Sequence, residues 1–168
     1  MSASTLSFTN DGNLIIPREV LVHRRHITTI TAVGIGGLVG EIDWQEKAFV
    51  INGVRRSWDE IRVKNSRLEF FKCSWTWGDI PTYKFEYQNH NKELVATPTT
   101  PNPAIIFTGY RPKAFHRHAT EPASVQFPLG LNAYDEIERM FVLMAMVHSE
   151  VKKGDLEAAA AAAGGGGG

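Results

Sequence analysis

The sequence predicts an α+β protein that is mainly β: an antiparallel barrel or sandwich of about seven strands with one C-terminal helix. Two observations predict this class. Short runs rich in Val, Ile, Thr and aromatic residues recur along most of the chain, and turn residues separate them at hairpin spacing. A single stretch near the C-terminus instead has apolar residues at the spacing of three and four that is typical of a helix.

The first predicted element is a hairpin. Residues 6–9 and 13–16 flank Asn10-Asp11-Gly12, a turn signal because glycine accepts a positive φ. Residues 19–33 are rich in Val, Ile and Thr, which favours a strand. The glycine-rich segment 34–37 that follows predicts a turn or a close backbone approach. It lacks the Gly-Lys-Ser/Thr ending of a phosphate-binding loop.

A second hairpin is predicted from residues 38–44 and 48–51, and its second arm ends at Asn52-Gly53. Residues 55–63 fit either another strand or one helical turn around 57–60, and both interpretations stay open. The segment from 98 to 122 is expected to be irregular because its prolines remove ladder donors. Further strands are predicted at 67–77, 83–87, 94–97, 105–107 and 124–129.

The C-terminal helix is the strongest single prediction. Asn132 is a credible N-cap, and Asp135 and Glu136 lie in the first turn, where the helix dipole favours negative charge. Gly154 is placed to terminate the helix. The residues that share its apolar face are Tyr134, Ile137, Phe141, Met144, His148 and Val151. The neighbours Met140, Leu143 and Met146 widen this face, so the helix is either deeply buried or meets a partner.

Composition limits the classes of protein. The chain has 168 residues, of which 1–155 are expected to form one domain and 156–168 to be a cloning-derived or placeholder tail. The balance of 18 Lys+Arg against 18 Asp+Glu argues against a general nucleic-acid binder. One cysteine fits a reducing compartment. The start has no secretory signal and no apolar run is long enough to span a bilayer, so the expected location is cytoplasmic.

The order of hairpins and terminal helix resembles a pleckstrin-homology-like domain over residues 14–153. The hairpin Asp43-Trp44…Phe49-Val50-Ile51, its continuation Ser57-Trp58-Asp59-Glu60-Ile61 and the terminal helix around 135–141 are similar to small bacterial domains found near type VI secretion and polymorphic-toxin genes. The resemblance implies an immunity or adaptor protein whose partner is a toxin or a secretion component.

Two aromatic-rich loops are the predicted partner-binding sites. Gly78, Asp79 and Pro81 signal a turn after Trp75 and Trp77, so at least one tryptophan is expected at a loop tip, where it could anchor a partner. The alternative is that both rings fill the end of the barrel. The long loop 98–122 has a similar profile, because long loops in compact domains are often functional. Its candidate residues are Tyr110, Arg111, Phe115 and Arg117.

The sequence signals for a metal-binding or catalytic site are weaker than those for the partner-binding loops. His116 and His118 would share one face of a strand and could chelate a metal with His90 or Cys73, but the same residues fit a solvated basic loop. Cys73 lies in an apolar strand, as a small buried hydrophobe does. No hydrolase, metalloprotease, paired-cysteine or phosphate-loop motif is present. We therefore predict no catalytic residue, no metal and no cofactor.

The hypothesis that follows is a non-enzymatic protein-binding module that uses aromatic and arginine anchors on loops, or an exposed sheet edge. Two alternatives remain. A membrane-peripheral headgroup binder would use Arg24, Arg25, Arg55 and Arg56, although lipid-binding pleckstrin-homology domains place their basic cluster differently, on the first hairpin. A metal-dependent enzyme would be centred on the histidines at 116 and 118.

Overall fold

The computed structural model describes the backbone of residues 3–8, 13–16, 27–32, 38–64, 72–88, 90, 93–109, 111–112, 120–121, 123–130 and 133–164. Side chains are described in the same ranges from residue 27 onward, except at 32, 64, 111, 112, 120 and 121. The predicted class is confirmed: the described protein is mainly β, its sheets are antiparallel in all but one pairing, and one long helix follows the strands.

Two groups of antiparallel strands form the body of the molecule. The first comprises β3 (Ile27–Ala32), β4 (Val39–Asp43), β5 (Ala48–Ile51) and β6 (Val54–Ser57) in sequential order. The second runs in the order β14 (Ala123–Gln126), β11 (Ile105–Thr108), β10 (Glu93–Pro98), β9 (Ile80–Gln88), β8 (Lys72–Trp77) and β7 (Arg62–Lys64).

The N-terminal hairpin joins the two groups. As predicted, β1 (Ala3–Phe8) and β2 (Asn13–Ile16) pair antiparallel, with Ser7 opposite Ile15. β1 also pairs parallel with β3, and β2 pairs antiparallel with β14. The described strands therefore form one hydrogen-bonded order of 12, from β6 at one end to β7 at the other. Among the described strands those two ends are not paired with each other, so the sheet is not a closed barrel, and the expected barrel or sandwich of about seven strands was too simple.

A short helical turn connects the two ends. α2 (Trp58–Ile61) follows β6 directly and precedes β7, so the alternatives left open for 55–63 are both present, as strand, turn and strand. The predicted hairpin of β4 and β5 is confirmed, with Asp43 opposite Ala48 and a turn at Asn52-Gly53 in which both residues have positive φ. A further short pair, β12 (Arg111–Pro112) and β13 (Thr120–Glu121), lies within the proline-rich segment.

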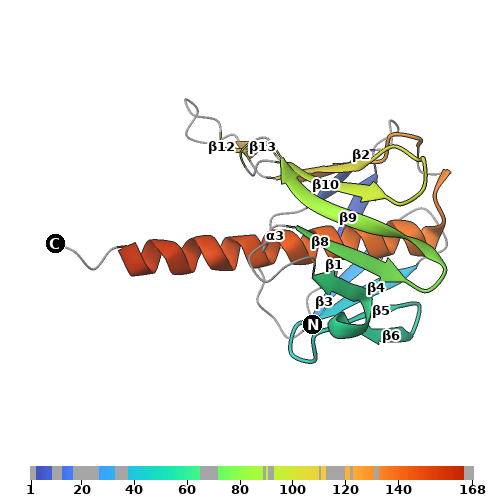
Figure 1. Cartoon of the computed structure of the whole chain (residues 1–168), viewed down its shortest axis with the longest axis horizontal. Helices are drawn as coiled ribbons and strands as arrows, with labels where there is room; N and C mark the ends of the chain where they lie inside the picture. Colours follow the sequence, from blue (N-terminus) through green and yellow to red (C-terminus); the bar gives the residue numbers. More distant parts are fainter. Residues whose placement is uncertain are drawn as a thin grey trace.

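Helix α3 (Glu136–Gly164) lies between the two groups of strands (Figure 1). Residues 139–148 are buried without interruption, which confirms the deeply buried alternative. On one side the helix packs on β4 at Gly40, where an added Cβ would lie 2.5 Å from Met140 Sδ and 2.7 Å from Met144 Sδ. On the other side the Tyr83 hydroxyl of β9 donates to Glu138 Oε1 at 2.6 Å.

The predicted C-terminal end of this helix at Gly154 is wrong, and the predicted N-cap at Asn132 stays a prediction. The helix continues through Gly154 to Gly164, and its C-terminal part projects away from the strands (Figure 1). The alanines after Gly154 are the best helix formers, so they extend the helix across a single glycine. At the start, Asp135 Oδ1 accepts a hydrogen bond from the Ile137 amide at 2.8 Å, as an N-cap does. Asn132 lies outside the described residues.

Candidate functional site

The most distinctive surface feature is the place where the hydrogen-bonded order begins and ends. We call it the edge seam: edge strands β6 and β7 with the turn α2 between them. Among the described residues no strand pairs with the outer side of either edge. Unpaired edge strands present backbone donors and acceptors to other chains.

Local hydrogen bonds fix the turn inside the edge seam. The Ser57 amide donates to Glu60 Oε2 at 2.7 Å, and this bond is the main reason that the pKa of Glu60 lies below its usual value. The Trp58 amide donates to the Lys47 carbonyl at 2.8 Å, which ties α2 to the turn between β4 and β5. The two edges are therefore held at a defined spacing by a capped turn.

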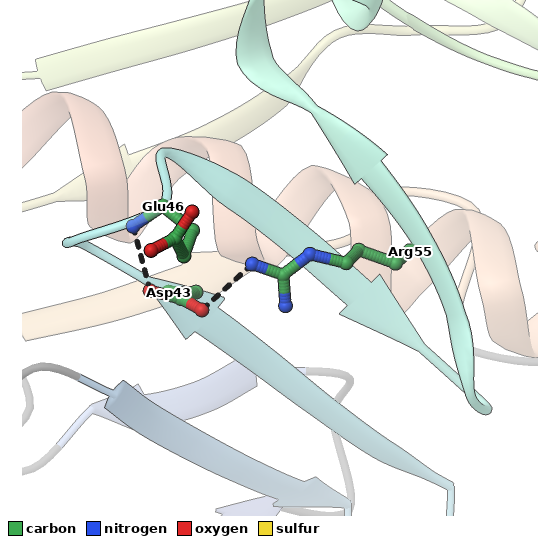
Figure 2. Close-up of polar contacts among 3 residues, drawn as sticks. All are labelled: Asp43, Glu46 and Arg55. Carbon is green, nitrogen blue, oxygen red and sulfur yellow. Dashed lines mark hydrogen bonds and ion pairs between the residues drawn. The ribbon is translucent and has the colours of Figure 1, made fainter.

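Arg55 is on the outer face of β6 and is already engaged. Its Nη2 donates to Asp43 Oδ2 at 2.8 Å, and Asp43 Oδ1 accepts the Glu46 amide at 2.9 Å (Figure 2). The Glu46 amide first, and then Arg55, hold the pKa of Asp43 below its ordinary value. This network stabilises the β4–β5 turn, and it leaves Arg55 facing away from its neighbour Arg56.

Arg56 and Arg62 lie on the inner side of the edge seam. Arg56 pairs across the ladder with buried Phe49, and Arg62 pairs with buried Trp75. The guanidinium carbon of Arg56 is 5.5 Å from the centroid of the Trp77 ring, and that of Arg62 is 5.5 Å from the Trp75 ring. Both are cation–π contacts, so each edge strand directs one arginine over one tryptophan.

The predicted position of the tryptophans at a loop tip is wrong. Trp75 is 0% and Trp77 6% exposed, because both belong to β8 and point inward with Cys73 at alternate positions. The turn itself was predicted correctly and follows at Gly78, which has φ 54°. Burying two large rings removes much apolar area from water, and this favours the inward orientation. The rings therefore support the site from below the arginines.

Beneath Trp75 lies an aromatic cage that the sequence did not indicate. His148 of α3 is 2% exposed. Its ring is 4.3 Å from Trp58, 5.1 Å from Trp75, 5.6 Å from Trp44 and 6.0 Å from Phe49, measured between centroids. The cage connects the helix to α2, β5 and β8. The sequence marked His148 only as a member of an apolar helix face.

His148 is held neutral in this cage. Neither ring nitrogen has a hydrogen-bond partner in the part of the chain that the structure describes. Burial is the main cause that lowers the pKa of His148 to about 3, and the positive charges of Arg62 and Lys152 lower it further. The imidazole therefore acts as an apolar core ring at neutral pH, and we assign it no proton-transfer role.

The other predicted residues fall into four groups: buried, exposed, described only as backbone, and outside the described ranges. Cys73 is buried, and its sulfur accepts the Trp75 indole N–H at 3.1 Å. His90 is exposed on a turn, and among described side chains no three metal-ligating residues gather. Arg111 is described only as backbone in β12. Residues 24, 25, 110, 115, 116, 117 and 118 lie outside the described residues.

Comparison with known proteins adds no family to this picture. No family model, curated protein or solved structure matches the chain. No helix in the described part of the chain combines the length and the apolar character needed to cross a membrane.

Proposed function

We propose that this protein is a non-enzymatic protein-binding module that holds an extended segment of its partner at the edge seam. The observation that carries the proposal is the pair of edge strands, β6 and β7, that no described strand covers. A peptide that adds to such an edge gains main-chain hydrogen bonds, while the pleat sorts its side chains to two faces. Of the two anchoring modes that the sequence predicted, loops and a sheet edge, the structure supports the edge.

The biological setting that we propose follows from the pleckstrin-homology-like resemblance: an immunity or adaptor protein of a bacterial toxin or type VI secretion system, working in the cytoplasm. The hairpins followed by a C-terminal helix support this proposal. The partner would then be a toxin or a secretion component. Co-purification with the products of adjacent genes tests this setting independently of the edge seam.

An unbiased peptide selection tests the binding mode. We would select binders from a displayed library of random linear peptides and map them by changes in backbone amide chemical shifts. We expect the amides of residues 54–57 and 62–64 to shift most, because an added strand hydrogen-bonds to an edge. Selection that yields no binder, or binders that shift only amides outside the edge seam, would contradict the proposal.

A further inference from the structure

The inner side of the edge seam carries two arginines with unused donors. The Nε atoms of Arg56 and Arg62 are shielded from solvent, and neither has a hydrogen-bond partner among the described residues. Neither arginine forms an ion pair with a described carboxylate, although Arg55 next to them does. A shielded donor without a partner costs free energy, so a ligand that supplies an acceptor gains by satisfying it.

The nearest acidic side chain does not meet this need. Glu60 interacts with Arg56 only through longer-range attraction, and its Oε2 is occupied by the Ser57 amide at 2.7 Å. Asp43 is engaged by Arg55 on the opposite face of β6. Each of the two inner guanidinium groups therefore carries a positive charge over a tryptophan ring and has no carboxylate partner among the described residues.

Strand geometry determines what an incoming segment would present there. A strand that pairs with β6 or β7 places every second side chain on the inner face, beside Arg56 or Arg62. An apolar side chain at that position would bury the guanidinium without a partner, which is costly. A carboxylate beside the guanidinium would compensate its positive charge and could accept a charge-assisted hydrogen bond from it.

We propose that the edge seam recognises an extended acidic segment, in which an Asp or Glu side chain on the inner face pairs with Arg56 or Arg62. This inference rests on the proposed binding function and states the chemistry of its partner. The same arginines exclude neutral or basic strands, so the two edges accept one class of segment and reject others.

The experiment uses two short peptides that alternate Thr or Val with either Glu or Gln, titrated into the full chain and followed by tryptophan fluorescence and calorimetry. We expect the Glu peptide to bind at least about tenfold more tightly than the Gln peptide, the factor that one charge-assisted hydrogen bond supplies. The double variant R56Q/R62Q should remove this preference. The matched control R55Q makes the same change on the outer face and should keep the preference for the Glu peptide.

The outcomes separate the inference from the function beneath it. Equal affinity for the two peptides, with the amide shifts still at β6 and β7, would overturn the acidic preference and leave the binding module intact. An equal loss of the Glu preference in R55Q and R56Q/R62Q would mean that the preference comes from long-range attraction and not from Arg56 or Arg62, and it would overturn the inference. Dimerisation that R56Q/R62Q abolishes, without Glu-peptide binding, would assign the edge seam to a second copy.

Peptide binding that is absent altogether, in both the selection and the titration, would overturn both proposals. The comparison of Glu and Gln peptides uses the unaltered chain, so it is decisive even where R56Q/R62Q fails to fold. R62K adds a second check, because lysine keeps the charge but loses the planar fork. We expect R62K to lower the preference for Glu and to leave circular dichroism unchanged.

Discussion

At the scale of single residues, His148 shows how burial decides what a titratable group does. Its ring is surrounded by Trp44, Phe49, Trp58 and Trp75, and no described residue forms a hydrogen bond with it. Desolvation disfavours the imidazolium, so the unfolded chain binds a proton at His148 more readily than the folded chain does. Folding stability is therefore linked to pH through this residue.

We expect H148F to flatten the loss of stability in acid. The pKa of His148 falls from 6.5 in the unfolded chain to about 3 in the folded chain, so its contribution to stability is fully present above pH 6.5 and is lost as pH falls toward 3. The slope is at most about 1.4 kcal/mol per pH unit. Urea unfolding at several pH values measures it. H90N, at an exposed turn with φ 58°, is the control.

Urea unfolding curves of H148F that keep the full loss of stability in acid would contradict this assignment.

Single residues also show which features of the structure the sequence could predict. Lys72, Ser74 and Thr76 alternate with Cys73, Trp75 and Trp77, so the pattern itself indicates that the tryptophans share an inward face. The turn residues that follow at Gly78 favoured a loop tip for at least one tryptophan, and that prediction is wrong. The cage around His148 brings together residues from distant elements, and local patterns carry no signal of it.

At the scale of elements, helix α3 depends on a close approach to β4. Gly40 provides it, because the sulfur atoms of Met140 and Met144 occupy the space of a side chain. The sequence predicted the strand and the helix, since each has its own period. It did not predict that they meet at Gly40, because contacts distant in sequence leave no local pattern.

We expect G40V to destabilise the protein by roughly 1–3 kcal/mol, the usual cost of overpacking a core. Denaturant unfolding gives the value. Shortening one methionine should relieve the clash, so M140A should cost less in the G40V background than in the unaltered chain. Unchanged stability in G40V would mean that the two elements do not pack this closely.

Gly154 offers a test of where the helix ends. It lies within α3, and outside the helix's own backbone no atom of the described residues lies within 4 Å of an added Cβ. We expect G154A to stabilise the protein by roughly 0.5–1 kcal/mol, because alanine is the better helix former. Thermal unfolding measures the change. A helix that ended at Gly154, as the sequence predicted, would gain nothing or lose stability.

At the scale of the whole molecule, the sheet is an open structure with two adjacent free edges among its described strands. The sequence predicted the hairpins, because turn chemistry is local. It did not predict the parallel pairing of β1 with β3 or the pairing of β2 with β14, which join segments far apart in the chain. Because those pairings join the two groups of strands, they leave β6 and β7 as the two ends of the hydrogen-bonded order. The edge seam could therefore not be predicted from local patterns.

We expect R56V/R62V to self-associate. Inward-pointing charges on edge strands oppose unwanted pairing, and valine removes both charges while favouring strands. Light scattering after size-exclusion chromatography should show a larger species that grows with concentration. R55V, on the outer face of the same strand, serves as the comparison. Monomeric R56V/R62V at all concentrations would mean that the arginines do not guard the edges.

The burial of residues 139–148 on every side has a consequence for biosynthesis. The described strands all precede this helix in the chain, so during translation they leave the ribosome before the segment that fills their interior. The apolar faces of the nascent strands therefore stay exposed until α3 has been synthesised and has folded between them. A chaperone, or a ligand strand already seated on the sheet, would protect the protein most during that interval.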